Sequence, residues 1–188
     1  MQHHFRRDKF AWTEDFFLAV LKHSHRKYDV YWAVLGLRDC GTSRSIPHLK
    51  DKLAFPMQDI KATAILTIAH IAGPAETALY AEALLDPKYR EKGYAMWAIR
   101  DSADDRAVDA VIAYFRKNMS RIRRGQFHNA TLPDGLEYLH KFIDAKPEVT
   151  MLFSDIKGCW EQIAEGERVE ISKRAPYFLT TGSVGGAG

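Results

Sequence analysis

With 188 residues, the chain is long enough for one compact core but short for two independent ones, so we expect a single domain over residues 1–188. Hydrophobic residues make up 46% and charged residues 27%, a balance that argues against a disordered chain. The net charge of +3 falls short of the strongly basic footprint of an obligate nucleic-acid binder. Two distant cysteines, Cys40 and Cys159, argue against a disulfide framework and favour a cytoplasmic location.

The N-terminal region shows helical periodicity. Aromatic and aliphatic residues recur between residues 8 and 25, which predicts an amphipathic helix that caps the N-terminal end of the fold. A partner-binding role for this helix is the alternative. The apolar run from Phe16 to Leu21 is too short to span a bilayer, so we expect no membrane association.

Internal self-similarity at a period of 31 residues dominates the middle of the chain, residues 28–118. The matching stretches are 36–53, 67–84 and 98–115. In the second half of each, residues at i, i+3 and i+7 form one stripe of an α-helix, not the period-two pattern of a strand. The stripe residues are Ile46, Leu49 and Leu53, then Thr77, Tyr80 and Leu84, then Val108, Val111 and Phe115.

Helix breaks agree with this register. Pro74 lies in the turn inside the second copy, and Asp104 is placed to cap the second helix of the third. Pro56 and Pro87 fall between copies, where a helix must stop. One hairpin cannot bury its apolar stripe alone, so neighbouring hairpins must stack. The sequence therefore predicts an all-α fold, an α-α superhelix of about three helical hairpins with capping helices at both ends.

The repeat resembles the short HEAT-like repeat of the phycobilisome-lyase type. The matching residues are Gly41, Arg44, Ile46, Pro47, Leu49 and Leu53 in the first copy, Ile68, Ile71, Pro74, Ala83 and Leu84 in the second, and Asp104, Arg106, Ala107 and Val108 in the third. The resemblance implies a HEAT-like solenoid. It says little about activity, because the same scaffold serves many functions.

Beyond the repeats, residues 119–165 predict degenerate C-terminal helices at 135–145 and 148–164. The stretch 126–135 reads as a loop because turn-forming residues gather in it. Residues 166–188 have no clear period, and we expect an irregular tail.

Motifs of known catalytic or metal chemistry are missing from the sequence. Glu137 and His140 form one E-x-x-H, but a di-iron site needs a second such motif and two further carboxylates. Cys40 occupies an apolar consensus position, which favours a buried side chain over a nucleophile. The Arg38–Asp39 and Arg100–Asp101 pairs recur two copies apart at helix ends, which favours ion pairs over an active site. We expect no metal, no cofactor and no catalytic residue.

Candidate binding residues come from the second helices, which line the concave wall in solenoids of this kind, and from the basic cluster after the third copy. They are His48, Asp51, Lys52, Leu79, Glu82, Arg116, Arg121, Arg123 and Arg124. Their mixed charge favours a protein partner over a polyanion. We therefore expect a non-enzymatic protein-binding module, with an inhibitor, immunity-type or scaffold role as an analogy from size and scaffold.

Two other functions stay open. The cluster Arg121, Arg123 and Arg124 could touch phosphates in a nucleic-acid-binding or DNA glycosylase-like protein, which would need a basic strip with a carboxylate at its centre. The same arginines are also what the dipole of a helix C-terminus attracts. The resemblance itself implies a third possibility, a bilin lyase-like protein that handles a chromophore.

Overall fold

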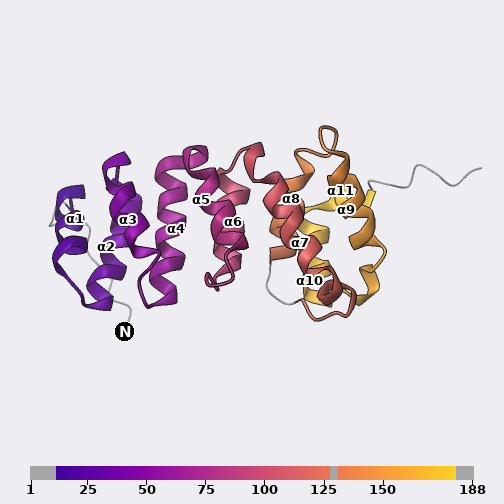
Figure 1. Cartoon of the computed structure of the whole chain (residues 1–188), viewed down its shortest axis with the longest axis horizontal. Helices are drawn as coiled ribbons and strands as arrows, with labels where there is room; N and C mark the ends of the chain where they lie inside the picture. The colour runs from indigo at the N-terminus through magenta and orange to yellow at the C-terminus, as the bar shows by residue number, and fades with distance from the viewer. Residues whose placement is uncertain (1–11, 128–130, 181–188) are drawn as a thin grey trace, which may run out of the picture. The chain divides into compact units, whose positions relative to one another are not determined.

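The computed structural model describes residues 12–127 and 131–180, which are helical and contain no strand (Figure 1). The all-α prediction is confirmed. The chain divides into two compact units, an N-terminal unit of residues 1–72 and a C-terminal unit of residues 73–188. This division falls inside the second predicted hairpin, so the single domain and the solenoid stay predictions. Among the residues described, no helix has the length and apolarity needed to cross a membrane.

The N-terminal unit, drawn in indigo to purple in Figure 1, is a set of helices that pack side by side. Its elements are α1 (Glu14–His23), α2 (Lys27–Cys40), the 3-10 turn η1 (Ser43–Ser45), α3 (Ile46–Lys52) and α4 (Gln58–Ala72). Helix α2 packs against α1 and α4, and α3 packs against α4. Leu37, Leu49 and Ile68 are fully buried between these helices. The buried Thr67 hydroxyl donates to the Val34 carbonyl at 3.2 Å, which ties α4 to α2.

The N-terminal helix begins later than the expected residue 8. Residues 1–11 lie outside the described chain, and α1 starts at Glu14. Thr13 is its N-cap: the backbone there is extended, and the side-chain oxygen accepts from the Phe16 amide. Glu14 and Asp15 follow in the first turn, where carboxylates interact favourably with the helix dipole. The N-cap at Thr13 therefore sets the start of α1, whereas the periodic pattern of aromatic residues begins earlier in the sequence.

The C-terminal unit contains the remaining elements. They are η2 (Gly73–Glu76), α5 (Thr77–Leu85), α6 (Lys92–Ser102), η3 (Asp105–Ala107), α7 (Val108–Arg123), α8 (Thr131–His140), α9 (Pro147–Lys157), η4 (Trp160–Gln162), α10 (Glu165–Arg174) and α11 (Pro176–Thr180). Helix α5 packs against α6 and α7, α6 against α8, α8 against α10, and α7 against α9. Tyr80, Phe115 and Tyr138 are the bulkiest side chains of its core.

The helical stripes read from the 31-residue period are buried as predicted. All of their residues are less than a tenth exposed except Leu53, which lies just past the end of α3 and is half-buried. The turns before α3 and α7 also share one geometry. Thr42 and Asp104, two periods apart, each accept a hydrogen bond from the amide two residues later and cap a 3-10 turn that leads directly into the helix. Asp104 therefore caps the 3-10 turn that precedes α7, whereas the predicted cap of α7 itself is wrong because Ala107 is the N-cap of that helix.

The predicted loop at 126–135 is wrong in its second half, where α8 begins at Thr131; residues 128–130 lie outside the described chain. Pro133 is the third residue of α8, within the first turn, where a helix does not use the amide hydrogen that proline lacks. Gly135 reflects close packing, because a Cβ atom there would lie 2.4 Å from the Phe115 ring. Pro133 and Gly135, which favoured a turn in the sequence, are therefore part of a helix.

Two C-terminal boundaries also differ from expectation. Helix α8 ends at His140, and the chain continues in turns in which the Lys141 and Phe142 amides donate to the carbonyls three residues earlier. Lys146, just before Pro147, is extended, as residues before proline are. Helix α9 stops at Lys157, and the chain passes through Gly158 into η4. Glycine is a poor helix former, which accounts for the break.

The irregular tail expected at 166–188 is helical over most of its described length. Helix α10 is strongly polar, and only Ile171 is buried along it. Arg174 at its last turn bonds to carboxylates of α8, and Phe178 of α11 is fully buried. Tertiary contacts therefore specify this segment, which has little periodicity to read. Residues 181–188 lie outside the described chain.

Candidate functional site

The candidate binding residues of the second helices lie in both units. On α3, His48 and Asp51 are exposed, whereas Lys52 is half-buried and its ammonium donates to the Leu21 carbonyl at 3.0 Å. On α5, Glu82 is exposed and Leu79 is half-buried. Lys52 is thus partly a structural residue that closes the end of α1. Because these residues belong to different units, a partner face that joins them stays a prediction.

The basic cluster lies on the last turns of α7 and is exposed. We define the α7 basic surface as Arg116, Lys117, Arg121, Arg123 and Arg124, all of which are exposed. The Arg124 guanidinium donates to the Ser120 carbonyl at 3.1 Å, and that of Arg121 donates to the Gln126 carbonyl at 3.3 Å. These two bonds fit the expectation that arginines gather at a helix C-terminus. They occupy only part of the donor capacity of each guanidinium.

The end of α7 is held by a glycine in the left-handed region. Gly125 has a φ of 64°, and its amide donates to Ile122 while that of Gln126 donates to Arg121, the bond pattern of a Schellman cap. A Cβ atom on Gly125 would lie 2.6 Å from the Gln162 carbonyl. Glycine therefore allows both the turn and the close approach of the α7 end to η4.

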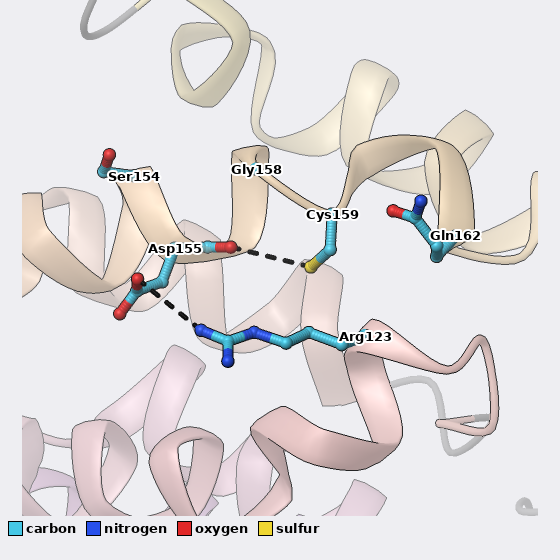
Figure 2. A pocket seen from close by; sticks show the side chains of 6 residues that line it. All are labelled: Arg123, Ser154, Asp155, Gly158, Cys159 and Gln162. Atoms are coloured by element: carbon cyan, nitrogen blue, oxygen red, sulfur yellow. Dashed lines mark hydrogen bonds and ion pairs between the residues drawn. The ribbon is translucent and has the colours of Figure 1, made fainter.

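Beside this cap lies a pocket of about 350 Å³ between the end of α7 and the α9–η4 segment (Figure 2). Its lining residues are Arg123, Ser154, Asp155, Gly158, Cys159 and Gln162. Figure 2 shows Arg123 reaching across toward Asp155, with the guanidinium and carboxylate 3.8 Å apart. Both side chains are more than half exposed, so water screens this pair and it contributes little to stability.

The thiol in the pocket is not set up as a nucleophile. Cys159 is buried, and its Sγ lies 3.2 Å from the Ile156 carbonyl and 3.6 Å from that of Asp155, as a hydrogen-bond donor. Burial raises the pKa of the thiol, which keeps it protonated at neutral pH. The half-buried Cys40 also has a raised pKa because of burial. Neither cysteine presents a thiolate.

Sequence reasoning missed the most highly connected polar residue of the C-terminal unit, Asp134. Its carboxylate is 1% exposed and accepts hydrogen bonds from the Trp97 indole at 2.8 Å and from both Arg100 and Arg174. Arg100 also pairs with Asp101 at 2.6 Å. The network joins α6, α8 and α10. The sequence did single out the pair Arg100–Asp101. However, Asp134, the other partner of Arg100, lay in the stretch 126–135 that was predicted to be a loop.

Both arginines of this network remain charged. The hydrogen bond to Asp101 raises the pKa of Arg100. Burial lowers the pKa of Arg174, but the hydrogen bonds to Asp134 and Glu137 and the charge of Asp134 together more than offset this, and the pKa ends above its usual value. With its oxygens occupied by three donors, Asp134 is placed to clamp helices together. It is not placed to accept a proton from a substrate.

The E-x-x-H pair does not form a metal site. Glu137 pairs with Arg174 at 3.1 Å, while the His140 ring stacks on Tyr177 with centroids 3.3 Å apart. Nδ1 of His140 is buried and has no hydrogen-bond partner in the described chain, and burial lowers the pKa of the ring. Over the described ranges, no group of three potential ligands from His, Cys, Asp and Glu comes together.

Comparison with protein-family models, curated proteins and solved structures finds no match to this chain. The resemblance to the HEAT-like repeat therefore stays a prediction that rests on the 31-residue register.

Proposed function

We propose that the chain is a non-enzymatic binding protein whose α7 basic surface, with the adjoining pocket, holds an acidic segment of a protein partner. The observation that carries the proposal is the charge of this surface. No carboxylate occurs in the sequence between Asp109 and Asp134, a stretch that contains all five cations of the α7 basic surface. Carboxylates suit guanidinium groups because the two can form paired hydrogen bonds.

The pocket gives such a segment a place to bind. Arg123 stands at its edge with Asp155 as an exposed partner, so a carboxylate from another molecule can replace Asp155 at small cost. Ser154 and Gln162 supply hydroxyl and amide groups that can bond to a peptide backbone. The fixed Schellman cap holds the arginine side of the pocket in place.

A protein segment fits this surface better than a nucleic acid does. The aromatic rings near the end of α7, Tyr114, Phe115 and Phe127, are all buried. Among the described residues at the end of α7, bases therefore find no exposed ring on which to stack, although stacking supplies much of the affinity for single strands. The glycosylase-like alternative needs a reactive carboxylate in a basic groove. The carboxylate of this pocket is Asp155, which is more than half exposed and lies 3.8 Å from Arg123, so it has the surroundings of an ordinary surface carboxylate.

The HEAT-like solenoid belongs to the same proposal. Two observations support it: the buried stripes that follow the 31-residue period, and the equivalent caps at Thr42 and Asp104. An inhibitor or immunity-type role remains an analogy based on size and scaffold.

The test is affinity capture from the native host's lysate after nuclease treatment, using three baits. These are the wild type, the reversal variant Arg121→Glu/Arg123→Glu/Arg124→Glu, and a control, Arg38→Glu/Lys88→Glu/Arg90→Glu. The control alters three other exposed cations and changes the net charge equally. Captured proteins are quantified by mass spectrometry, and crosslinks are mapped on both chains.

We expect one stoichiometric partner that binds the wild type and the control but not the reversal variant. Crosslinks should join an acidic segment of the partner to residues around the pocket. Equal capture by all three baits, or a partner lost only in the control, would show that the α7 basic surface is not the binding site. Bait-bound nucleic acid that disappears with the α7 reversal would reassign this surface to a polyanion.

A further inference from the structure

The connection between α1 and α2 carries a second basic cluster, separate from the α7 basic surface. The cluster, which we call the 22–27 loop, consists of the cations Lys22, Arg26 and Lys27 with the imidazole side chains of His23 and His25, and all five side chains are exposed. Within the described residues, no ion pair joins any of them to a carboxylate. The neighbouring acid, Asp29, is engaged by the Ser24 hydroxyl at 2.7 Å.

Helix stability does not explain where these cations lie. Lys22 and His23 end α1, where positive charge is favourable, but Arg26 is the N-cap of α2 and Lys27 its first residue. A cation at a helix N-terminus opposes the helix dipole. The Arg26 side chain makes no capping hydrogen bond, whereas Ser, Thr, Asp or Asn at this position would stabilise the helix. The pair is thus unfavourable for α2 itself.

Two exposed aromatic rings stand beside the loop. Tyr28 is 64% and Trp32 51% exposed, the highest values among the large hydrophobic residues of the described chain apart from Met151. They lie four residues apart on one face of α2, so their attachment points are separated by about 6 Å along the helix. The opposite face carries Val30 and Val34, which are fully buried, so the rings are not needed for the core.

Contacts within the fold position the side chains of the 22–27 loop and of the neighbouring rings. The Lys27 ammonium lies 5.0 Å from the centre of the Tyr28 ring, and Tyr31 packs edge-on against Trp32 with centroids 5.5 Å apart. Lys52 extends the positive charge, because its ammonium is bonded to the Leu21 carbonyl at the end of α1. The Lys27 ammonium thus lies beside the first ring, and the second ring follows one helical turn further along α2.

We propose that the 22–27 loop, with Tyr28 and Trp32, binds single-stranded nucleic acid. Lysine and arginine neutralise consecutive phosphates, while exposed rings offer the faces on which unpaired bases stack. An acidic peptide would use the cations but leave the two rings without a role. An anionic membrane would use both, but only two rings of α2 are available for insertion, because its apolar face is buried in the core.

The test measures fluorescence anisotropy of a labelled 20-nucleotide oligo(dT), with a 20-base-pair duplex and phosphatidylserine vesicles as competitors. The variants are Arg26→Ala/Lys27→Ala and Tyr28→Ala/Trp32→Ala, with Lys88→Ala/Arg90→Ala as a matched control of exposed cations in the other unit. Circular dichroism confirms that each variant is folded. Each binding curve is repeated over a range of salt concentrations.

The wild type and the control should bind oligo(dT) equally and in preference to the duplex. Loss of the two rings should weaken binding roughly five- to a hundredfold for each stacked base. Loss of Arg26 and Lys27 should reduce the slope of log affinity against log salt by about 1.4, the value for two phosphates on a single strand. The two variants thus report separate parts of the site.

Unchanged affinity in both variants would overturn the proposal, as would stronger competition by the duplex. If the protein binds phosphatidylserine vesicles but not oligo(dT), the patch is a membrane site instead. The Arg121→Glu/Arg123→Glu/Arg124→Glu variant separates this proposal from the proposed protein-binding function. If only that variant loses oligo(dT) binding, the α7 basic surface binds nucleic acid, and both proposals fail.

Discussion

Substitution of Asp134 by alanine tests whether the carboxylate network holds the C-terminal unit together. The change removes the acceptor shared by Trp97, Arg100 and Arg174, which come from α6 and α10. It leaves two guanidinium groups close together without their common counter-charge. Because the Asp134 side chain is 1% exposed, the space it leaves is not open to bulk water.

The expected loss follows from the burial of each partner. Hydrogen bonds to charged groups contribute roughly 1.5–3 kcal/mol each, so three bonds set an upper limit of several kcal/mol. The Arg100 and Arg174 side chains are 22% and 28% exposed, so both can regain some water when Asp134 is lost. Breaking a buried ion pair costs about 3–5 kcal/mol, and partial rehydration places Asp134→Ala near the lower end.

Asp101→Ala is the matched control, since Asp101 pairs with the same Arg100 but is 56% exposed. An exposed pair contributes about 0–1 kcal/mol. The assay is urea unfolding followed by circular dichroism, with the free energy of unfolding obtained by linear extrapolation. If Asp134→Ala and Asp101→Ala cost the same, or if Asp134→Ala costs less than about 1 kcal/mol, the network is not a buried clamp and our reading of α8 is wrong.

Three further predictions concern other parts of the fold. Leu49→Asp should unfold the N-terminal unit, because the side chain is fully buried; an unchanged circular dichroism melting curve would contradict this. The hydrogen bond from Ser45 lowers the pKa of Glu14, so its contribution to stability should be present above the unfolded-state pKa and lost as the pH falls through the folded-state pKa. Glu14→Gln should flatten the acid limb of the profile of melting temperature against pH, and an equally steep limb would refute this. Gly125→Ala should cost about 1–3 kcal/mol in urea unfolding because of its positive φ, whereas Gly166→Ala, in open space at the start of α10, should be neutral or stabilising; equal effects would rule out strain at Gly125.

The core was predictable because it follows a regular period. Leu49, Tyr80 and Val111 stand at equivalent points of the 31-residue register, and all three are fully buried. Each is one member of a helical stripe, so an error at one position is corrected by its neighbours. Leu53 is half-buried because α3 ends one residue earlier, and a helix end depends on local capping more than on periodicity.

The polar network could not be predicted in the same way. Asp134 follows Pro133 and precedes Gly135, and this tripeptide is typical of a turn. Its helical state depends on the close approach of Gly135 to Phe115, and its function as an acceptor depends on Arg174, which lies on a helix with little apolar periodicity. Contacts between segments distant in the sequence determine both the helical conformation at Asp134 and its hydrogen bonding. Neither can be predicted from the neighbouring residues alone.

The net charge alone does not describe how charge is distributed, because total charge and local charge differ in this chain. Ion pairs such as Arg100 with Asp134 remove one charge of each sign and leave the net value of +3 unchanged. Among the described residues, exposed cations are dense in the 22–27 loop and on the α7 basic surface, although single exposed cations such as Arg38 and Lys88 lie elsewhere. Charges separated by more than about 8 Å are largely screened at physiological salt, so a partner responds to each cluster and hardly to the total. A modest net charge therefore does not exclude polyanion binding when the unpaired cations are contiguous and the carboxylates are engaged elsewhere.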